Sequence, residues 1–185
     1  VSITDDDDTT PPVISTVTIP NTPMKIGDVV TATITVASDT DTLTLVSGSI
    51  AGINLVSISK ASDTTYTASF TIPEAGTDFA AGFDLPVSLV LKDSANNNSL
   101  AFTAGINLNA DAIDANRPTI SVLTRQAPTS QYTNADSLTF LVTFTEAVTG
   151  VDAADFMVNG TTATISSLTT SDNLNYLLTL TGGDL

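Results

Sequence analysis

The apolar residues of this chain alternate with threonine and serine over most of its length. In the segment VVTATITV, residues 29–36, the apolar side chains fall on one side and the threonines on the other. The same period of two recurs in TYTASFTI, residues 65–72, and in LTFLVTF, residues 138–144. A period of two indicates a half-buried β-strand, and no stretch shows a convincing helical period. The alternation therefore predicts an all-β chain.

Turn signals such as SDTD and KDSANNNS divide this pattern into short strands. In the first part of the chain we expect strands at residues 13–19, 29–36, 42–46, 53–60, 65–72, 85–92 and 100–108. In the second part we expect them at residues 119–125, 138–145, 156–158, 163–168 and 174–181. About seven short strands in roughly 100 residues are typical of an immunoglobulin-like β-sandwich. Cysteine and tryptophan are absent, so the sandwich would be of a disulfide-free kind.

Two pairs of segments indicate an internal repeat. DDDDTTPPVIS at residues 5–15 matches DAIDANRPTIS at residues 111–121, and GDVVTATITV at 27–36 matches ADSLTFLVTF at 135–144. The repeat predicts tandem immunoglobulin-like β-sandwich modules, the second one incomplete. We assign residues 1–10 to an acidic linker or the end of a preceding module, 11–110 to a module, 111–117 to an acidic linker and 118–185 to a partial second module. Counterparts of 85–92 and 100–108 are missing there, so either that module is cut short or later chain completes it, for instance after an inserted domain.

The charge balance excludes several partners. The chain has 20 acidic and five basic residues, a formal net charge of −15, so nucleic acids and anionic membrane surfaces are poor partners. No apolar run approaches the roughly 18–20 residues that cross a bilayer, and the start shows no signal peptide. The absence of histidine and cysteine removes imidazole bases, thiol nucleophiles and the usual zinc sites.

The acidic residues are almost all aspartates. Only Glu74 and Glu146 are glutamates, and the other 18 acids are Asp, which favours turns and linkers. Carboxylates in loops are suitable ligands for calcium. Paired carboxylates can also mean a glycosidase, but nothing in the sequence places two acids across a cleft. We therefore predict a calcium-binding protein that is not an enzyme.

The segments DTTPPVISTVTIPNTPMKIGDVVTATITV and LKDSANN resemble the immunoglobulin-like repeats of giant calcium-dependent bacterial surface adhesins, the RTX adhesins exported by type I secretion. NADSLTFLVTFTEAVTGVDAADFMVNGT resembles another repeat type of such proteins. The resemblance implies modules that stack end to end, bind calcium at their junctions and hold a ligand-binding domain away from the cell. It covers nearly the whole chain.

The resemblance also implies particular calcium ligands. Asp114 and Asn116 match the linker position at which family members bind calcium, and Asp8 is the earlier equivalent. Asp111 is the counterpart of Asp5 when the segments at 5–15 and 111–121 are aligned. Asp93 matches the acid of the family's D-x-x-G-N loop, although the glycine of that pattern is missing here. The alternative for the linkers is a solvated acidic hinge that extends by self-repulsion.

Further candidate calcium ligands lie in loops. Asp28 and Asp136 precede the second strand of each module, where they could reach the linker ion or cap a turn. Glu74 lies in a long loop and would be a good bidentate ligand. Glu146, Asp152 and Asp155 are close enough in sequence to share a loop site, but Asp152 could equally cap the single turn DAAD.

Together these features predict a structural extender segment of a large secreted bacterial adhesin, stiffened by calcium at its module junctions. The alternative is a split module that presents an inserted ligand-binding domain, or a module that itself binds glycan or protein. The partners would be neighbouring modules of the same chain, with any host-cell, surface or glycan ligand bound by other domains. We expect an extracellular monomer at the bacterial surface.

Overall fold

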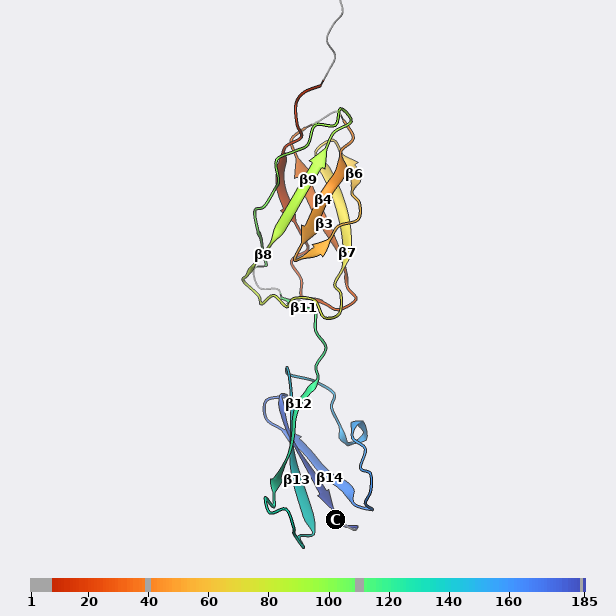
Figure 1. Cartoon of the computed structure of the whole chain (residues 1–185), viewed down its shortest axis with the longest axis vertical. Helices are drawn as coiled ribbons and strands as arrows, with labels where there is room; N and C mark the ends of the chain where they lie inside the picture. The colour runs from red at the N-terminus through yellow and green to blue at the C-terminus, as the bar shows by residue number, and fades with distance from the viewer. Residues whose placement is uncertain (1–7, 39–40, 109–111, 184) are drawn as a thin grey trace, which may run out of the picture. The chain divides into compact units, whose positions relative to one another are not determined.

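The structure, a computed structural model, describes residues 8–38, 41–108, 112–183 and 185 (Figure 1). Every regular element in these ranges is a β-strand except one short 3-10 turn, η1 (Ala153–Asp155). The prediction of an all-β chain is confirmed. No helix in these ranges is long and apolar enough to cross a membrane. The chain forms two compact units, Val1–Arg117 and Pro118–Leu185.

The first unit contains two main antiparallel sheets. One has the order β1-β3-β7-β6, formed by β1 (Ile14–Thr18), β3 (Val29–Val36), β7 (Thr65–Thr71) and β6 (Ser59–Ser62). The other has the order β5-β4-β9, formed by β5 (Ile53–Asn54), β4 (Thr44–Ile50) and β9 (Val87–Lys92). Two short pairs complete the unit: β8 (Asp84–Leu85) with β10 (Ile106–Asn107), and β2 (Met24–Lys25) with β11 (Ile113–Asp114).

The alternation seen in the sequence decides which side chains form the core of this unit. Every second residue of β3, from Val30 to Val36, is buried, and the intervening threonines are not. β7 buries Tyr66, Ala68 and Phe70 in the same way, and β9 also buries alternate residues. The buried side chains of both sheets belong to one cluster, which gives the unit a β-sandwich character.

Two expected strands of the first unit differ in the structure. The strand expected at residues 42–46 is longer, because β4 continues to Ile50 through Gly48. A Cβ at Gly48 would lie 3.0–3.1 Å from leucine side chains, so this inward position has no room for a larger residue. Because glycine stands where an apolar side chain is expected, the alternation cannot be seen in the sequence of β4. The single strand expected at 53–60 is wrong. β5 ends at Asn54 after a tight turn with positive φ at Ala51 and Gly52, and β6 then joins the other sheet.

The end of the first unit also differs from expectation. The strand expected at residues 100–108 is reduced to one bridge between Phe102 and Leu89 and the two residues of β10. Part of the predicted linker, 111–117, is packed into the unit: Ile113 and Ala115 are buried in its core. The period of two in such a short segment cannot show this, because the segment is placed by long-range pairing, with β2 and with Phe79.

The second unit has one four-stranded antiparallel sheet with the order β12-β13-β15-β14. Its strands are β12 (Ile120–Ala127), β13 (Ser137–Phe144), β15 (Asn175–Thr181) and β14 (Thr164–Thr170). The strand expected at residues 156–158 is wrong, since this segment follows η1 without pairing. Phe156 instead packs against the small core of Val142, Val148, Tyr176 and Leu178.

The sheets of the two units are built alike. The order β12-β13-β15-β14 repeats β1-β3-β7-β6, and the loop-closing hydrogen bond from Val36 N to Thr64 O recurs from Phe144 N to Leu174 O. A buried tyrosine of the third strand fixes the loop after the second strand in both units. Tyr66 Oη donates to Asp41 O at 3.4 Å, and Tyr176 Oη donates to Val148 O at 3.0 Å.

Candidate cation site

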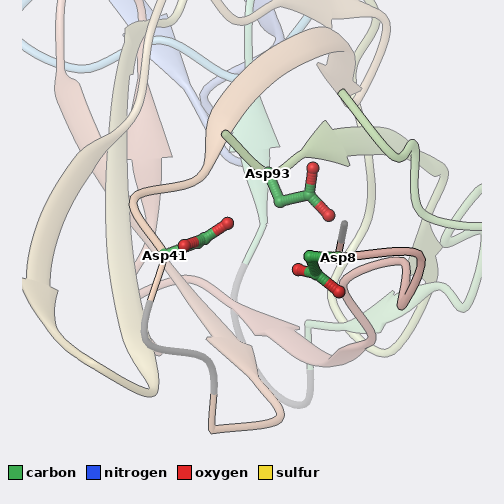
Figure 2. Close-up of side chains that lie close together, drawn as sticks. All are labelled: Asp8, Asp41 and Asp93. Atoms are coloured by element: carbon green, nitrogen blue, oxygen red, sulfur yellow. The ribbon is translucent and has the colours of Figure 1, made fainter. Parts of the chain in front are cut away.

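Three aspartates from three separate segments meet at one end of the first unit. Each of Asp8, Asp41 and Asp93 offers a carboxylate oxygen, and these oxygens all lie within 4.8 Å of one another. Figure 2 shows the three side chains around a common space. Within the described ranges of the chain, no other group of three or more acidic side chains comes this close together.

The β-sandwich brings these three residues together because each adjoins a strand or its loop. Asp8 lies on the segment that leads into β1, Asp41 precedes β4, and Asp93 directly follows β9. Asp93 is only 2% exposed, whereas Asp8 is exposed. Ser94 Oγ donates to Asp41 Oδ2 at 2.6 Å, which links the Asp41 loop to the turn after β9.

Asn97 organises the turn after β9 around Asp93. Its backbone N–H donates to Asp93 Oδ1 at 2.8 Å and its side-chain Nδ2 donates to Asp93 Oδ2 at 2.9 Å. The same Nδ2 also donates to the backbone oxygen of Asp8 at 2.8 Å, which ties the entering segment to this turn. Asn96 has φ +70, a left-handed conformation that asparagine tolerates better than most residues. Asn96 thus takes the conformation expected of the glycine missing from the D-x-x-G-N pattern.

This arrangement of oxygens is suited to a hard divalent cation. Calcium takes six to eight oxygen ligands and accepts irregular geometry, so three carboxylates and several waters can satisfy it. Asp93 forms no salt bridge with any lysine or arginine in the described ranges, and Asn97 donates one hydrogen bond to each of its two carboxylate oxygens. A cation would relieve the mutual repulsion of the three carboxylates.

The candidates of the second linker, Asp114 and Asn116, lie outside this cluster and are held by hydrogen bonds. Asp114 Oδ1 accepts from Asn116 N at 3.4 Å, and Asn116 Nδ2 donates to Gly76 O at 3.2 Å. Asp78 Oδ1 accepts from Ala115 N at 2.7 Å, which fastens the same segment to the loop before β8. Asp111 lies outside the described residues. The structure therefore brings no cluster of described acids together around Asp114.

The acids before the second strands and in the long loop do not join a cluster either. Asp28 Oδ2 accepts from Lys25 N at 2.9 Å, which is the turn-capping arrangement. Asp136 is exposed, and its backbone oxygen accepts from Gly182 N at 3.4 Å. Glu74 forms an exposed salt bridge with Arg117 at 3.2 Å.

Asp152 and Asp155 of the second unit cap the short 3-10 turn η1. Asp152 Oδ1 accepts from Ala154 N at 2.7 Å, and Asp155 Oδ2 accepts from Asp152 N at 2.9 Å, which together form a capping box around η1. The interpretation of Asp152 as a cap is therefore confirmed. Glu146 is half-buried in the turn after β13 and does not form a three-acid cluster with Asp152 and Asp155.

Sequence reasoning found two of the three clustered acids and missed Asp41. Its motif, SDTD, is a good turn signal, and nothing in the local sequence places that turn beside Asp93. The available clue was the strand arrangement of a sandwich, in which the loop before β4 and the turn after β9 lie together because β4 and β9 are neighbours.

Comparisons with known proteins give no relatives: no family model, curated protein or solved structure matches this chain.

Proposed function

We propose that this chain is a structural segment of a large secreted bacterial surface adhesin, made of immunoglobulin-like modules in series and stiffened by calcium. The observation that carries the calcium part is the convergence of Asp8, Asp41 and Asp93. The role in adhesion rests on the resemblance to the repeats of RTX adhesins. In this proposal the ligand of the adhesin is bound by other domains, and the chain does no catalysis.

The repeated sheet supports a modular, spacer-like role. Two units along one chain share the strand order of their four-stranded sheets and the position of a loop-fixing tyrosine. Repetition of one architecture is a common way to build length, because each unit folds around its own core. The acidic composition keeps such a chain soluble and resists unspecific association.

Calcium would act on the segment that enters the first unit. Asp8 belongs to this segment, whereas Asp41 and Asp93 belong to loops that are anchored by β4 and β9. An ion shared by the three would fix the entering segment against the sandwich. Without the ion, the three carboxylates repel one another, and the hydrogen bond from Asn97 Nδ2 to the Asp8 carbonyl still ties this part of the segment to the turn after β9.

The test is thermal unfolding and small-angle scattering of the chain in calcium and in excess chelator, at constant ionic strength so that screening is unchanged. Sites in extracellular modules bind calcium with dissociation constants of about 0.1–1 mM. At ten times the dissociation constant, the bound ion adds about 1.4 kcal/mol to the free energy of unfolding. We expect a higher melting temperature and a stiffer particle in calcium.

Two variants with the same change of charge locate the effect. Asp41→Asn removes a proposed ligand and should abolish the calcium-dependent rise in melting temperature. Asp136→Asn removes an exposed acid of the other unit and should leave the rise intact. If the parent chain shows no calcium dependence, the calcium proposal is wrong. A rise that persists in Asp41→Asn would instead place the ion at another site.

A second candidate function is a scaffold that docks or presents another segment. The observation that favours it is an apolar groove in the second unit with a volume of about 260 Å³. Glycan-binding surfaces are more polar than this groove, so it favours a polypeptide over a sugar.

A further inference from the structure

The inner face of the four-stranded sheet is covered differently in the two units. In the first unit a second layer lies over it, because β4, β8, β9 and β10 contribute buried apolar residues to the shared core. These residues are Ile50, Leu85, Val87, Leu89, Leu91 and Ile106, and Leu108, directly after β10, adds to them. In chain order, β4 lies between β3 and β6, whereas β8, β9 and the segment to Leu108 follow β7.

In the second unit the cover is partial. The segment between β13 and β14 packs Val148, Val151 and Phe156 against the sheet. Beside it runs the apolar groove, lined by residues of β12, β13 and β15 and walled by residues 156–159. None of the lining residues is charged, and several are strongly exposed: Leu123 is 62% exposed and Met157 is 82% exposed.

Side chains at equivalent positions of the two sheets are covered to different extents. Val17 pairs with Ile34 between the first and second strands of one sheet, and Leu123 pairs with Val142 at the same place in the other. Ile34 and Val142 are both fully buried. Val17 is 6% exposed, however, whereas Leu123 is 62% exposed. Val17 shares its core with Ile106 and Leu108, which belong to the segment after β9.

We infer that the apolar groove of the second unit is a docking site for a pair of extended strands with alternating apolar residues, joined after β15 as β8, β9 and β10 follow β7. The first unit shows both the kind of segment that covers this sheet and the order in which it arrives. The inference rests on the equivalence of the two sheets and is independent of calcium.

A second copy of the unit fits the groove less well. The wall formed by residues 156–159 stands over one part of the sheet, so two such faces cannot lie flat against each other. Sheets that pack face to face need inner faces that interdigitate about 10 Å apart across the whole contact. A narrow strand pair can lie beside the wall and reach Leu123.

The test appends residues 84–108 of this chain after residue 185, through a flexible linker that matches the β7-to-β8 connection in length. The control is the same fusion in which the appended counterparts of Val87, Leu89 and Leu91 are serine. Hydrogen exchange is measured on peptides from β13 and β15, and β3 serves as the internal reference. We expect exchange in β13 and β15 to be at least about tenfold slower in the apolar fusion than in its control.

A surface variant locates the docking. Leu123→Asp should remove the slowdown in the fusion, when exchange in the fusion is compared with exchange in the unfused chain that carries the same substitution. Equal exchange in the apolar fusion and its serine control would overturn the inference. So would a slowdown that survives Leu123→Asp. If the unmodified chain proves to be a dimer whose β13 and β15 protection depends on concentration, a second copy occupies the face and the inference is also overturned.

Discussion

The two units build the same four-stranded sheet and bury its inner face to very different extents. Among the described residues, the core cluster of the first unit contains 22 buried residues and that of the second contains four. β1 and β12 show the difference most clearly, since every residue of β12 except the half-buried Arg125 is exposed. The two central strands of each sheet are equal in length, eight residues in β3 and β13 and seven in β7 and β15, so the difference comes from what lies opposite the sheet.

This comparison separates two properties of a strand: the face to which each side chain points, and whether that face is buried. Alternation determines which side chains point to one face of a strand, and it is equally clear in β3 and β13. Burial requires a second layer, and it arises from segments distant in sequence such as β9. An apolar side chain on the inner face therefore contributes stability only where a covering segment removes it from water.

The largest expected effect comes from placing a charge at the two equivalent positions of the first strands. Val17→Asp puts a carboxylate among buried side chains without a partner, so we expect the first unit to lose about 3 kcal/mol or more of unfolding free energy. Leu123→Asp changes an exposed residue and should cost the second unit about 1 kcal/mol or less. Urea unfolding followed by amide NMR signals reports each unit separately. Equal losses in the two units would show that both inner faces are covered.

A smaller effect is expected from the two loop-fixing tyrosines. Tyr66 Oη accepts from Leu43 N at 2.9 Å in addition to donating to Asp41 O, and Leu43 is buried. Tyr66→Phe leaves that buried N–H without a partner, which should cost about 1–3 kcal/mol. Within the described part of the chain, the Tyr176 hydroxyl makes one hydrogen bond, to Val148 O, so Tyr176→Phe should cost about 0.5–1.5 kcal/mol.

The same NMR-detected urea unfolding measures both tyrosine variants, each within its own unit. Thr67→Val, on the outer side of β7, is a matched control that also removes one hydroxyl group without opening a cavity. A larger loss for Tyr176→Phe than for Tyr66→Phe would contradict the view that the two tyrosines fix equivalent loops with unequal numbers of hydrogen bonds.

The sequence predicted these strands better than it predicted their partners. β3, β7, β13 and β15 lie where the alternation places them, because each has enough residues for the period to show. Residues 53–60 were expected to form one strand, since a period of two cannot reveal that β5 and β6 belong to different sheets. Asp41 was missed for the same reason: its closeness to Asp93 depends on the pairing of β4 with β9. Local sequence determines the facing of side chains, whereas long-range pairing assembles the acidic cluster.

The smallest expected effect concerns the turns that join the last two strands of each sheet. Asp172 accepts hydrogen bonds from Asn175 Nδ2 and Asn175 N, both at 2.8 Å, and from Leu174 N at 3.0 Å. These bonds lower the pKa of Asp172 to about 2, the side-chain bond of Asn175 being the largest cause. In the first unit, Asp63 of the corresponding turn instead forms a salt bridge with Lys60 at 3.0 Å.

A carboxyl group whose pKa is lower in the folded than in the unfolded state stabilises the fold when ionised. The contribution of Asp172 is therefore present above pH of about 4, and it is lost as the pH falls toward about 2. Asp172→Asn should reduce the drop in the urea midpoint of the second unit between these pH values, and Asp63→Asn should leave that drop unchanged. An unchanged drop in Asp172→Asn would mean that the other carboxylates of the unit cause it. The Asp172 turn would then hold the β14–β15 hairpin through geometry alone, as an uncharged turn does.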